Sequence, residues 1–202
     1  AGKKISDLNL ERKKTKLIAV KKPVFPFNKF PNQKIFLSPE MRSTGEVIGF
    51  DKHLGSAYAK SEIGAGTKLP CAGNIFISVN DNDKKSIIKI ARDFTEMDFN
   101  IIATKGTASL LNQNGIHSKI IYKVGEGRPN IVDEIKNKNI HIIINTPLGA
   151  QSRYDEYQIG QSAIKFKIPV ITTLSAANAA LRAIRIMQNK KLSYSSLQEI
   201  FN

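Results

Sequence analysis

The stretch that decides the fold of this 202-residue chain is Phe99-Asn-Ile-Ile-Ala-Thr-Lys-Gly-Thr107. In it a short apolar, β-prone run passes directly into threonine and glycine residues that open a helix. Backbone N–H groups in the first turn of a helix lack intrahelical partners and carry the positive end of the helix dipole. Gly106 lets the backbone approach an oxyanion closely, and Thr104 and Thr107 add hydroxyl groups on either side. The same residues are also compatible with an ordinary helix N-cap.

Strands and helices are predicted to alternate on both sides of this stretch. After Pro70 the hydrophobic pattern predicts strands near 75–79, 99–103, 118–122, 140–145 and 168–172, and helices near 83–97, 106–114, 130–138, 153–167 and 174–189. Such alternation implies parallel strand pairing with right-handed crossovers. The inward stripes of two helices are expected at Ile87, Ala91 and Phe94, and at Leu174, Ala177, Leu181 and Ile184. The predicted fold class is therefore α/β, a parallel-sheet, Rossmann-like domain.

The first third of the chain has a different composition. Up to Pro31 it is basic and interrupted by prolines, a poor composition for an independent core, and residues 25–31 are expected to be extended and packed against a neighbour. Residues 52–63 predict a helix that carries Leu54, Tyr58 and Ile63 on or near one face and ends at Gly64–Gly66. A last short helical turn is expected within 195–201. These shifts divide the chain into domains at 1–69 and 70–202.

Polar residues follow several of the predicted strands at the point where each strand ends. In an open parallel sheet, ligands bind outside the carboxyl ends of the strands, so these residues are expected to share one rim. Lysines, hydroxyl groups and an amide over helix N-termini favour an anion pocket over an acid–base site, with ordinary solvated loops as the alternative. Arg128 either faces the anion or forms a structural salt bridge. The candidate site residues are Lys84, Thr104, Thr107, Lys123, Asn145 and Thr146.

Charge and composition narrow the class of protein. The net charge is +14, but ten of the Lys and Arg residues lie within 1–34, and the 24 lysines against 7 arginines indicate a coding bias. No nucleic-acid partner is therefore expected, although a basic nucleic-acid-binding module stays as an alternative. The single cysteine, Cys71, excludes an internal disulfide framework and favours a cytoplasmic location. No apolar run approaches the roughly 20 residues of a membrane span, and the three histidines lack metal-ligand spacing, so neither membrane nor metal is expected.

Five motifs in fixed order resemble the C-terminal end of the carbamoyl-phosphate synthase large-chain family. They are Phe25-Pro-Phe-Asn-Lys-Phe-Pro31, Pro39-Glu-Met-Arg-Ser-Thr-Gly-Glu-Val47, Ala103-Thr-Lys-Gly-Thr-Ala108, Lys123-Val-Gly-Glu-Gly-Arg-Pro129 and Ile144-Asn-Thr146. The resemblance covers essentially the whole chain. It implies that residues 1–69 are the C-terminal tail of the second ATP-grasp unit with a linker helix. It also implies that residues 70–202 are an allosteric domain with the fold of methylglyoxal synthase.

The same resemblance implies a regulatory role within a larger ligase. The parent of such a domain joins bicarbonate, glutamine-derived ammonia and ATP into carbamoyl phosphate for arginine and pyrimidine biosynthesis, with Mg or Mn. Its metal ligands are expected upstream of residue 1, so no catalytic residue, metal or cofactor is expected in this chain. Expected partners are a nucleotide monophosphate, the rest of the large chain and a glutaminase small chain, in an oligomeric parent of the cytoplasm or of a plastid. The family's effector positions fall on Lys84, Thr104, Thr107, Lys123 and Asn145.

Four departures from the family pattern bear on the effector. Pro147 replaces a threonine and Glu156 replaces a ligand-contacting serine, and a carboxylate near phosphate argues against uridylate. Lys22 and Val170 replace a glutamate and a tyrosine that bind ornithine in enterobacterial-type members, so ornithine activation of that kind is not expected. The competing enzyme hypothesis is a phosphate-eliminating lyase resembling methylglyoxal synthase, with Glu126 as its base.

Overall fold

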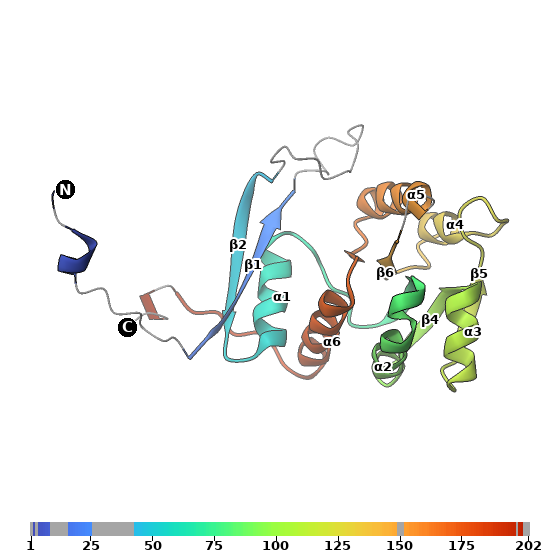
Figure 1. Cartoon of the computed structure of the whole chain (residues 1–202). Coiled ribbons are helices and arrows are strands. Elements are labelled where there is room, and N and C mark those ends of the chain that lie inside the picture. Colours follow the sequence, from blue (N-terminus) through green and yellow to red (C-terminus); the bar gives the residue numbers. More distant parts are fainter. Residues whose placement is uncertain are drawn as a thin grey trace.

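The computed structural model describes residues 2, 4–8, 16–25, 43–148, 152–196 and 198–199, and of residues 152–154 the backbone only (Figure 1). The first part holds the 3-10 turn η1 (Ile5–Leu8), the strands β1 (Ile18–Val24) and β2 (Gly45–Asp51), and helix α1 (Leu54–Gly64). The remainder alternates between strands and helices. Its elements are β3 (Gly73–Val79), η3 (Asp81–Asp83), α2 (Lys84–Thr95), β4 (Phe99–Thr104), α3 (Lys105–Gln113), β5 (Ser118–Ile121), α4 (Ile131–Lys136), β6 (Ile142–Thr146), α5 (Ser152–Phe166), β7 (Val170–Ile171) and α6 (Leu174–Asn189).

The larger sheet is parallel, as the alternation of strands and helices predicts. Its order is β5-β4-β3-β6-β7, and β3 pairs in parallel with both β4 and β6. Because the chain moves from β3 to β4 and β5 on one side and later to β6 and β7 on the other, the direction of winding reverses beside β3. Ligand sites of open α/β sheets lie at such a reversal, beyond the carboxyl ends of the strands.

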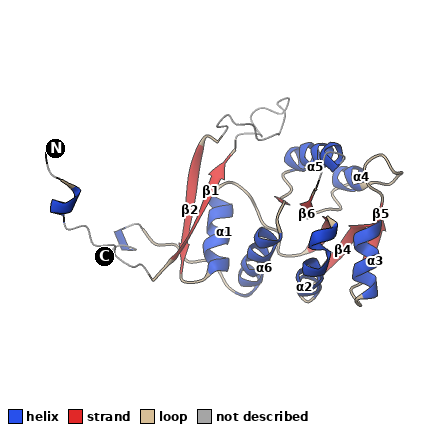
Figure 2. Ribbon diagram, in the orientation of Figure 1, coloured by secondary structure: helices blue, strands red, loops and turns tan. Residues whose placement is uncertain are grey.

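Helices cover both faces of this sheet and bury two hydrophobic cores (Figure 2). Alternate residues of a strand point to opposite faces, and β3 shows this division clearly. Ile75 and Ile77 pack with α2, α3 and α6, whereas Phe76 packs with α4 and α5. The predicted stripes of α2 and α6 are confirmed, since Ile87, Phe94 and the α6 residues Ala177, Leu181 and Ile184 are all buried. The fold is therefore three layers, with the parallel sheet in the middle.

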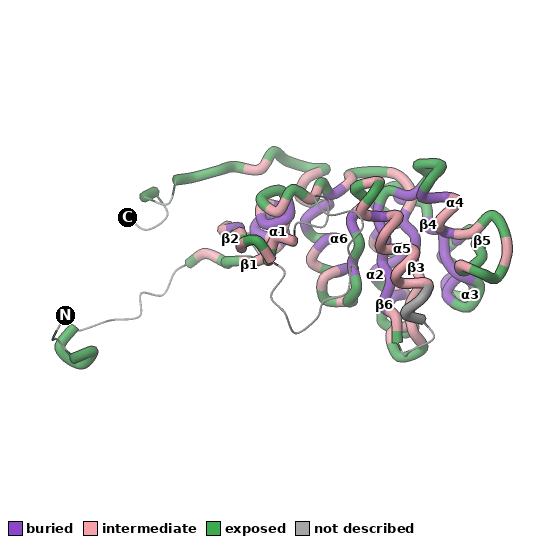
Figure 3. The backbone as a smooth tube through the Cα atoms, turned by 90° about the horizontal axis from the view of Figure 1, so that it is seen from above, coloured by how far each residue is buried: buried purple, intermediate pink, exposed green. Residues whose placement is uncertain are grey.

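The hairpin β1–β2 was not predicted from the sequence. Its strands pair antiparallel from Ile18↔Asp51 to Val24↔Gly45, and α1 packs against them. The buried carboxylate of Glu62 on α1 forms an ion pair with Lys22 on β1, and Lys60 pairs with Asp51 at 2.9 Å. Figure 3 shows α1 largely buried while β1 stays exposed or intermediate. The predicted helix over 52–63 is confirmed by α1, in which Leu54 and Tyr58 are partly buried and Ile63 is exposed.

Apart from Glu62, the buried residues of α1 are all small. Ala57 and Ala59 are fully buried, whereas Ile63 is 45% exposed. The reason is close packing on two sides, since α1 contacts both the hairpin and α6. A Cβ on Gly49 would lie 2.1 Å from the Ala57 carbonyl oxygen, and one on Gly55 would lie 2.6 Å from the Arg182 carbonyl oxygen. Larger side chains at these contacts would push the layers apart.

Two sequence-based predictions lie wholly or largely outside the described residues. They are the aromatic and proline segment 25–31 and the last helical turn within 195–201. The division into domains at 1–69 and 70–202 stays a prediction. Among the residues described, no helix combines the length and apolar character that crossing a membrane requires.

Candidate anion-binding site

Polar side chains from three adjacent strands line up where those strands end. Thr104 closes β4, Ser78 lies near the end of β3, and Asn145 lies opposite Ser78 in β6. The Thr104 hydroxyl is 3.4 Å from the Ser78 hydroxyl oxygen, and Thr104 and Asn145 are only 5% and 8% exposed. Ser78 was missed from the sequence, although it directly follows the buried run Ile75–Ile77. Across the centre of the sheet this row therefore holds the hydroxyl groups of Thr104 and Ser78 and the amide of Asn145.

The first turn of α3 begins beside this row. Thr104 is the N-cap residue of α3 by position, but its side chain accepts no hydrogen bond from the backbone of the helix. Its hydroxyl instead lies 3.5 Å from the hydroxyl oxygen of Thr107, which also accepts a hydrogen bond from the Val79 N–H at 3.4 Å. By contrast, α4 carries a full capping box built by Asn130 and Asp133. The ordinary N-cap alternative therefore does not describe Thr104, and an anion at this helix start would meet no side-chain cap.

A tight turn after β3 carries the first candidate lysine. The Asn80 side chain accepts hydrogen bonds from the Asn82 and Asp83 N–H groups, at 2.9 and 3.3 Å. The Asn80 backbone N–H and side-chain amide in turn donate to the Thr146 hydroxyl oxygen, at 3.3 and 3.2 Å. The hydroxyl oxygen of the buried Thr146 thus accepts two hydrogen bonds from the Asn80 turn, and its place among the ligand-binding residues stays a prediction. Helix α2 starts from this turn at Lys84.

The Lys84 ammonium lies at the start of α3. Outside α3 itself, a Cβ built on Gly106 would lie within 4 Å of one atom of the described residues, the Lys84 Nζ at 3.6 Å. The same Nζ lies 2.6 Å from Asp81 Oδ1 in an ion pair. Space is therefore open beside the backbone of Gly106, with one positive charge at its border.

Lys123 lies on an exposed loop, and its positive charge acts on the Asp81 and Asp155 carboxyls. The hydrogen bond and charge of Lys84 hold the pKa of the Asp81 carboxyl below its usual value, and the charge of Lys123 lowers it further. Burial raises the pKa of the Asp155 carboxyl on α5, while Lys123 opposes that shift and Glu126 adds to it. Lys84 and Lys123 thus act on one carboxylate. The structure places Lys84 beside the start of α3, where Thr104 and Thr107 lie, with Asn145 in the adjoining row, whereas Lys123 is connected to this group only through its charge acting on Asp81.

The other charged candidates of this rim, Arg128 and Glu126, each interact with a residue nearby in the sequence. Arg128 is 83% exposed and its Nε lies 3.9 Å from Asp133 Oδ2, which favours the salt-bridge alternative for this residue. The Glu126 carboxylate accepts a hydrogen bond from the Lys123 backbone N–H at 3.2 Å. Within the ranges that the structure covers, His, Cys, Asp and Glu side chains form no group of three or more suited to a metal ion.

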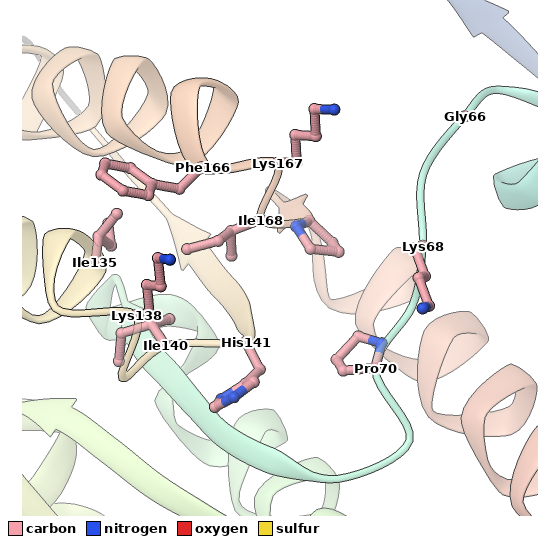
Figure 4. A pocket seen from close by; sticks show the side chains of 11 residues that line it. Gly66, Lys68, Pro70, Ile135, Lys138, Ile140, His141, Phe166, Lys167 and Ile168 are labelled. Carbon is pink, nitrogen blue, oxygen red and sulfur yellow. The ribbon is translucent and has the colours of Figure 1, made fainter.

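A cavity of about 430 Å³ lies at the opposite edge of the sheet, near the amino ends of β6 and β7 (Figure 4). Figure 4 shows the Lys138 side chain reaching toward Ile168, with Lys68 and Pro70 on the far wall. Helices α4 and α5 end at this edge, so the negative ends of their dipoles face it, while the cavity itself is lined by Lys68, Lys138 and Lys167. None of the candidate site residues lines this cavity.

Comparisons with known proteins place the sequence in a family. A family model described as an MGS-like domain matches residues 86–172. The chain is 44% identical over 200 residues to the carbamoyl phosphate synthase large chain of Nostoc sp., a match that covers 98% of this chain and 18% of that protein. It is 46% identical over 195 residues to the carbamoyl phosphate synthase large chain, C-terminal section, of Aquifex aeolicus, covering 94% of this chain and 36% of that protein.

One solved structure is also similar. Methylglyoxal synthase from Elizabethkingia anophelis aligns with a TM-score of 0.45 and 17% identity, covering 56% of this chain and 79% of that one.

The chain spans between about a fifth and just over a third of the length of the two carbamoyl phosphate synthase relatives. It belongs to the family of carbamoyl phosphate synthase large chains and contains an MGS-like domain.

Proposed function

We propose that this chain is the allosteric part of a carbamoyl phosphate synthase large chain and binds a nucleotide monophosphate. The observation that carries the proposal is the start of α3, where the Thr104 side chain makes no capping hydrogen bond and the hydroxyls of Thr104 and Thr107 lie 3.5 Å apart. Helix N–H groups and hydroxyl donors suit a phosphate better than a carbonyl or a cation.

Each candidate residue has a distinct part in this proposal. The α3 N–H groups, Thr104 and Thr107 hold the phosphate, because they are buried and fixed by the sheet and helix that carry them. Lys84, the first residue of α2, and Lys123, on the loop after β5, neutralise its charge. Asn145 orients the rest of the nucleotide from the neighbouring strand β6, since its amide lies across β3 from Thr104.

Regulation would operate by linkage to a larger enzyme. The parent makes carbamoyl phosphate from bicarbonate, glutamine-derived ammonia and ATP with Mg or Mn, and a glutaminase small chain supplies the ammonia. A nucleotide that binds one arrangement of this chain better than another biases that parent. Typical coupling free energies are about 1–3 kcal/mol, which shifts affinity and does not switch the chemistry off.

A thermal-shift panel tests the proposal on the 202-residue chain. Purine and pyrimidine 5′-monophosphates are added in series, and a specific ligand raises the unfolding temperature in proportion to ln(1 + [L]/Kd). Calorimetry then measures Kd for the strongest ligand, with the matching nucleoside as the control that lacks phosphate. If no monophosphate stabilises the chain more than its nucleoside, the proposal is wrong. Conversion of dihydroxyacetone phosphate, or salt-sensitive binding of random DNA, would instead favour the lyase or the nucleic-acid alternative.

A further inference from the structure

The cavity of about 430 Å³ at the amino ends of β6 and β7 is lined by side chains of two kinds (Figure 4). One kind is apolar and includes Pro70, Ile140, Phe166 and Ile168. The other kind carries nitrogen, on three lysines and one histidine, and no described side chain of the lining carries an oxygen atom. The cavity therefore combines apolar contact with positive charge and holds no carboxylate of its own, which suits an organic anion with an apolar body.

The lysines of the lining are not neutralised by neighbouring carboxylates. Within the part of the chain that the structure describes, Lys68, Lys138 and Lys167 form no ion pair. Figure 4 shows the Lys138 side chain reaching toward Ile168, with Lys68 on the opposite wall, whereas the Lys167 ammonium points away from the others. Lys138 and Lys68 are thus the two cations placed to meet a ligand from opposite sides.

Lys138 occupies a backbone position that favours other residue types. Helix α4 ends in a Schellman motif, in which the Lys138 and Asn139 N–H groups donate to the Ile135 and Glu134 carbonyl oxygens, at 3.0 and 2.9 Å. Lys138 has a φ of 60°, a conformation that glycine and asparagine adopt at lower cost. Lys136 already supplies a positive charge to the last turn of the helix. The backbone and the helix dipole therefore do not require a second lysine here, whereas an anion in the cavity would use it.

His141 adds a hydrogen-bond donor whose orientation is fixed. Its Nδ1 accepts a hydrogen bond from the Asn74 N–H at 3.0 Å, so the neutral ring carries its proton on Nε2. The ring packs on the backbone of Gly73, where a Cβ would lie 2.6 Å from the His141 Cγ. The absence of a side chain at Gly73 thus makes room for the ring, and the ring is in place before a ligand arrives.

We propose that this cavity binds an organic monoanion in which a carboxylate is attached to a compact apolar body. The carboxylate meets the Lys138 and Lys68 ammonium groups and the His141 N–H, and the apolar body packs against Phe166. Because the end of α4 and the segment 66–70 face each other across the cavity, a compact molecule fits it better than an extended peptide (Figure 4). The cavity is separate from the start of α3, so this proposal does not depend on the proposed function.

Naphthalene-2-carboxylate is the probe, and 2-naphthalenemethanol is its uncharged analogue. Each is titrated into the ¹⁵N-labelled 202-residue chain, and NMR gives both Kd and the amide signals that shift. We expect the carboxylate to bind about fivefold or more tighter than the alcohol, because several positively charged or donor groups meet it. The largest shifts are expected at His141 and Ile168, with Thr104 and Thr107 unchanged. Absence of binding, equal affinities, or shifts confined to other regions would each overturn the proposal.

The substitution Lys138→Asn tests the central contact. Asparagine accepts a φ of 60°, so the stability of the fold is expected to be kept. Binding of naphthalene-2-carboxylate is expected to weaken about two- to fivefold, as for loss of one exposed ion pair, and binding of the alcohol to stay unchanged. Lys136→Gln is the matched control, since it makes the same change in net charge on α4 outside the lining.

Equal losses of affinity in Lys138→Asn and Lys136→Gln would show that only net charge matters and would overturn the proposal. Tighter binding of an acidic aromatic dipeptide than of naphthalene-2-carboxylate would assign the cavity to a peptide segment and overturn it as well.

Discussion

The hydroxyl oxygens of Thr104 and Thr107 lie 3.5 Å apart at the start of α3, and both residues are at least 95% buried. They are fixed from different elements, since Thr104 closes β4 and Thr107 lies in the first turn of α3. The Ser78 hydroxyl and the Val79 N–H reach the pair from β3. The hydroxyl groups are therefore oriented before a ligand arrives, which lowers the entropic cost of binding.

The substitution Thr104→Val is expected to weaken binding of a nucleotide monophosphate about tenfold to a hundredfold, as loss of one hydrogen bond to a charged group implies. Valine keeps the buried shape but removes the hydroxyl, so the unfolding temperature is expected to change little. Calorimetry measures the affinity. Thr95→Val is the control, because the Thr95 hydroxyl bonds the Arg92 carbonyl oxygen at the far end of α2. Equal affinities for the two variants would contradict a role for Thr104.

The substitution Lys123→Ala is expected to weaken the same ligand about tenfold to a hundredfold, because it removes a charge-assisted hydrogen bond. Lys123 is exposed, so the stability of the fold is expected to stay unchanged. Lys136→Ala serves as the control, since Lys136 lies in the last turn of α4 and makes the same change in net charge. Unchanged affinity of Lys123→Ala by calorimetry would reject the assignment.

The sequence predicts the larger sheet well because its signals are strong and local. Runs such as Ile142–Ile144 are apolar throughout, as buried parallel strands are, and Asn or Thr residues mark the helix starts. The hairpin gives a weaker signal. In β1 a lysine, Lys22, takes an inward-facing position, and Pro23 interrupts the run. That lysine is accommodated only because Glu62, 40 residues later, pairs with it.

The site could be predicted in part for similar reasons. Residues that follow strands are visible in the sequence, and the topology brings Thr104, Thr107 and Lys84 to one edge. Ser78 could not be identified, because a single serine inside a strand carries no local signal of its neighbours. The structural role of Thr146 was also hidden, since it depends on Asn80, which directly follows β3 and lies 66 residues earlier.

The substitution Gly49→Ala is expected to destabilise the chain by about 3 kcal/mol, because the new methyl group meets backbone atoms that cannot rotate away. Its position would be 2.1 Å from the Ala57 carbonyl oxygen and 2.7 Å from the Ser61 nitrogen. Urea unfolding measures the change. Gly45→Ala in the same strand is the control, since no atom lies within 4 Å of its Cβ position. Equal losses for both variants would mean that strand propensity, and not the contact with α1, sets the cost.

The substitution Asp155→Asn is expected to stabilise the chain at neutral pH. Burial raises the pKa of this carboxyl above its ordinary value of 3.8, so the ionised form is less favourable in the folded state than in the unfolded state. Below the ordinary pKa both states hold the proton and the cost is absent. As the pH rises from the ordinary pKa to the raised folded-state pKa, stability is lost, and the asparagine variant does not share that loss.

Unfolding temperatures measured between pH 3 and pH 8 test this prediction. The curves of Asp155→Asn and the unmodified chain are expected to meet at the acidic end and to separate as the pH rises, with the variant higher. Glu156→Gln, which removes the same charge one position along α5, controls for the change in net charge. An opposing effect comes from the α5 dipole, which favours a carboxylate in the first turn. A variant less stable than the unmodified chain at neutral pH would show that this dipole outweighs the cost of burial.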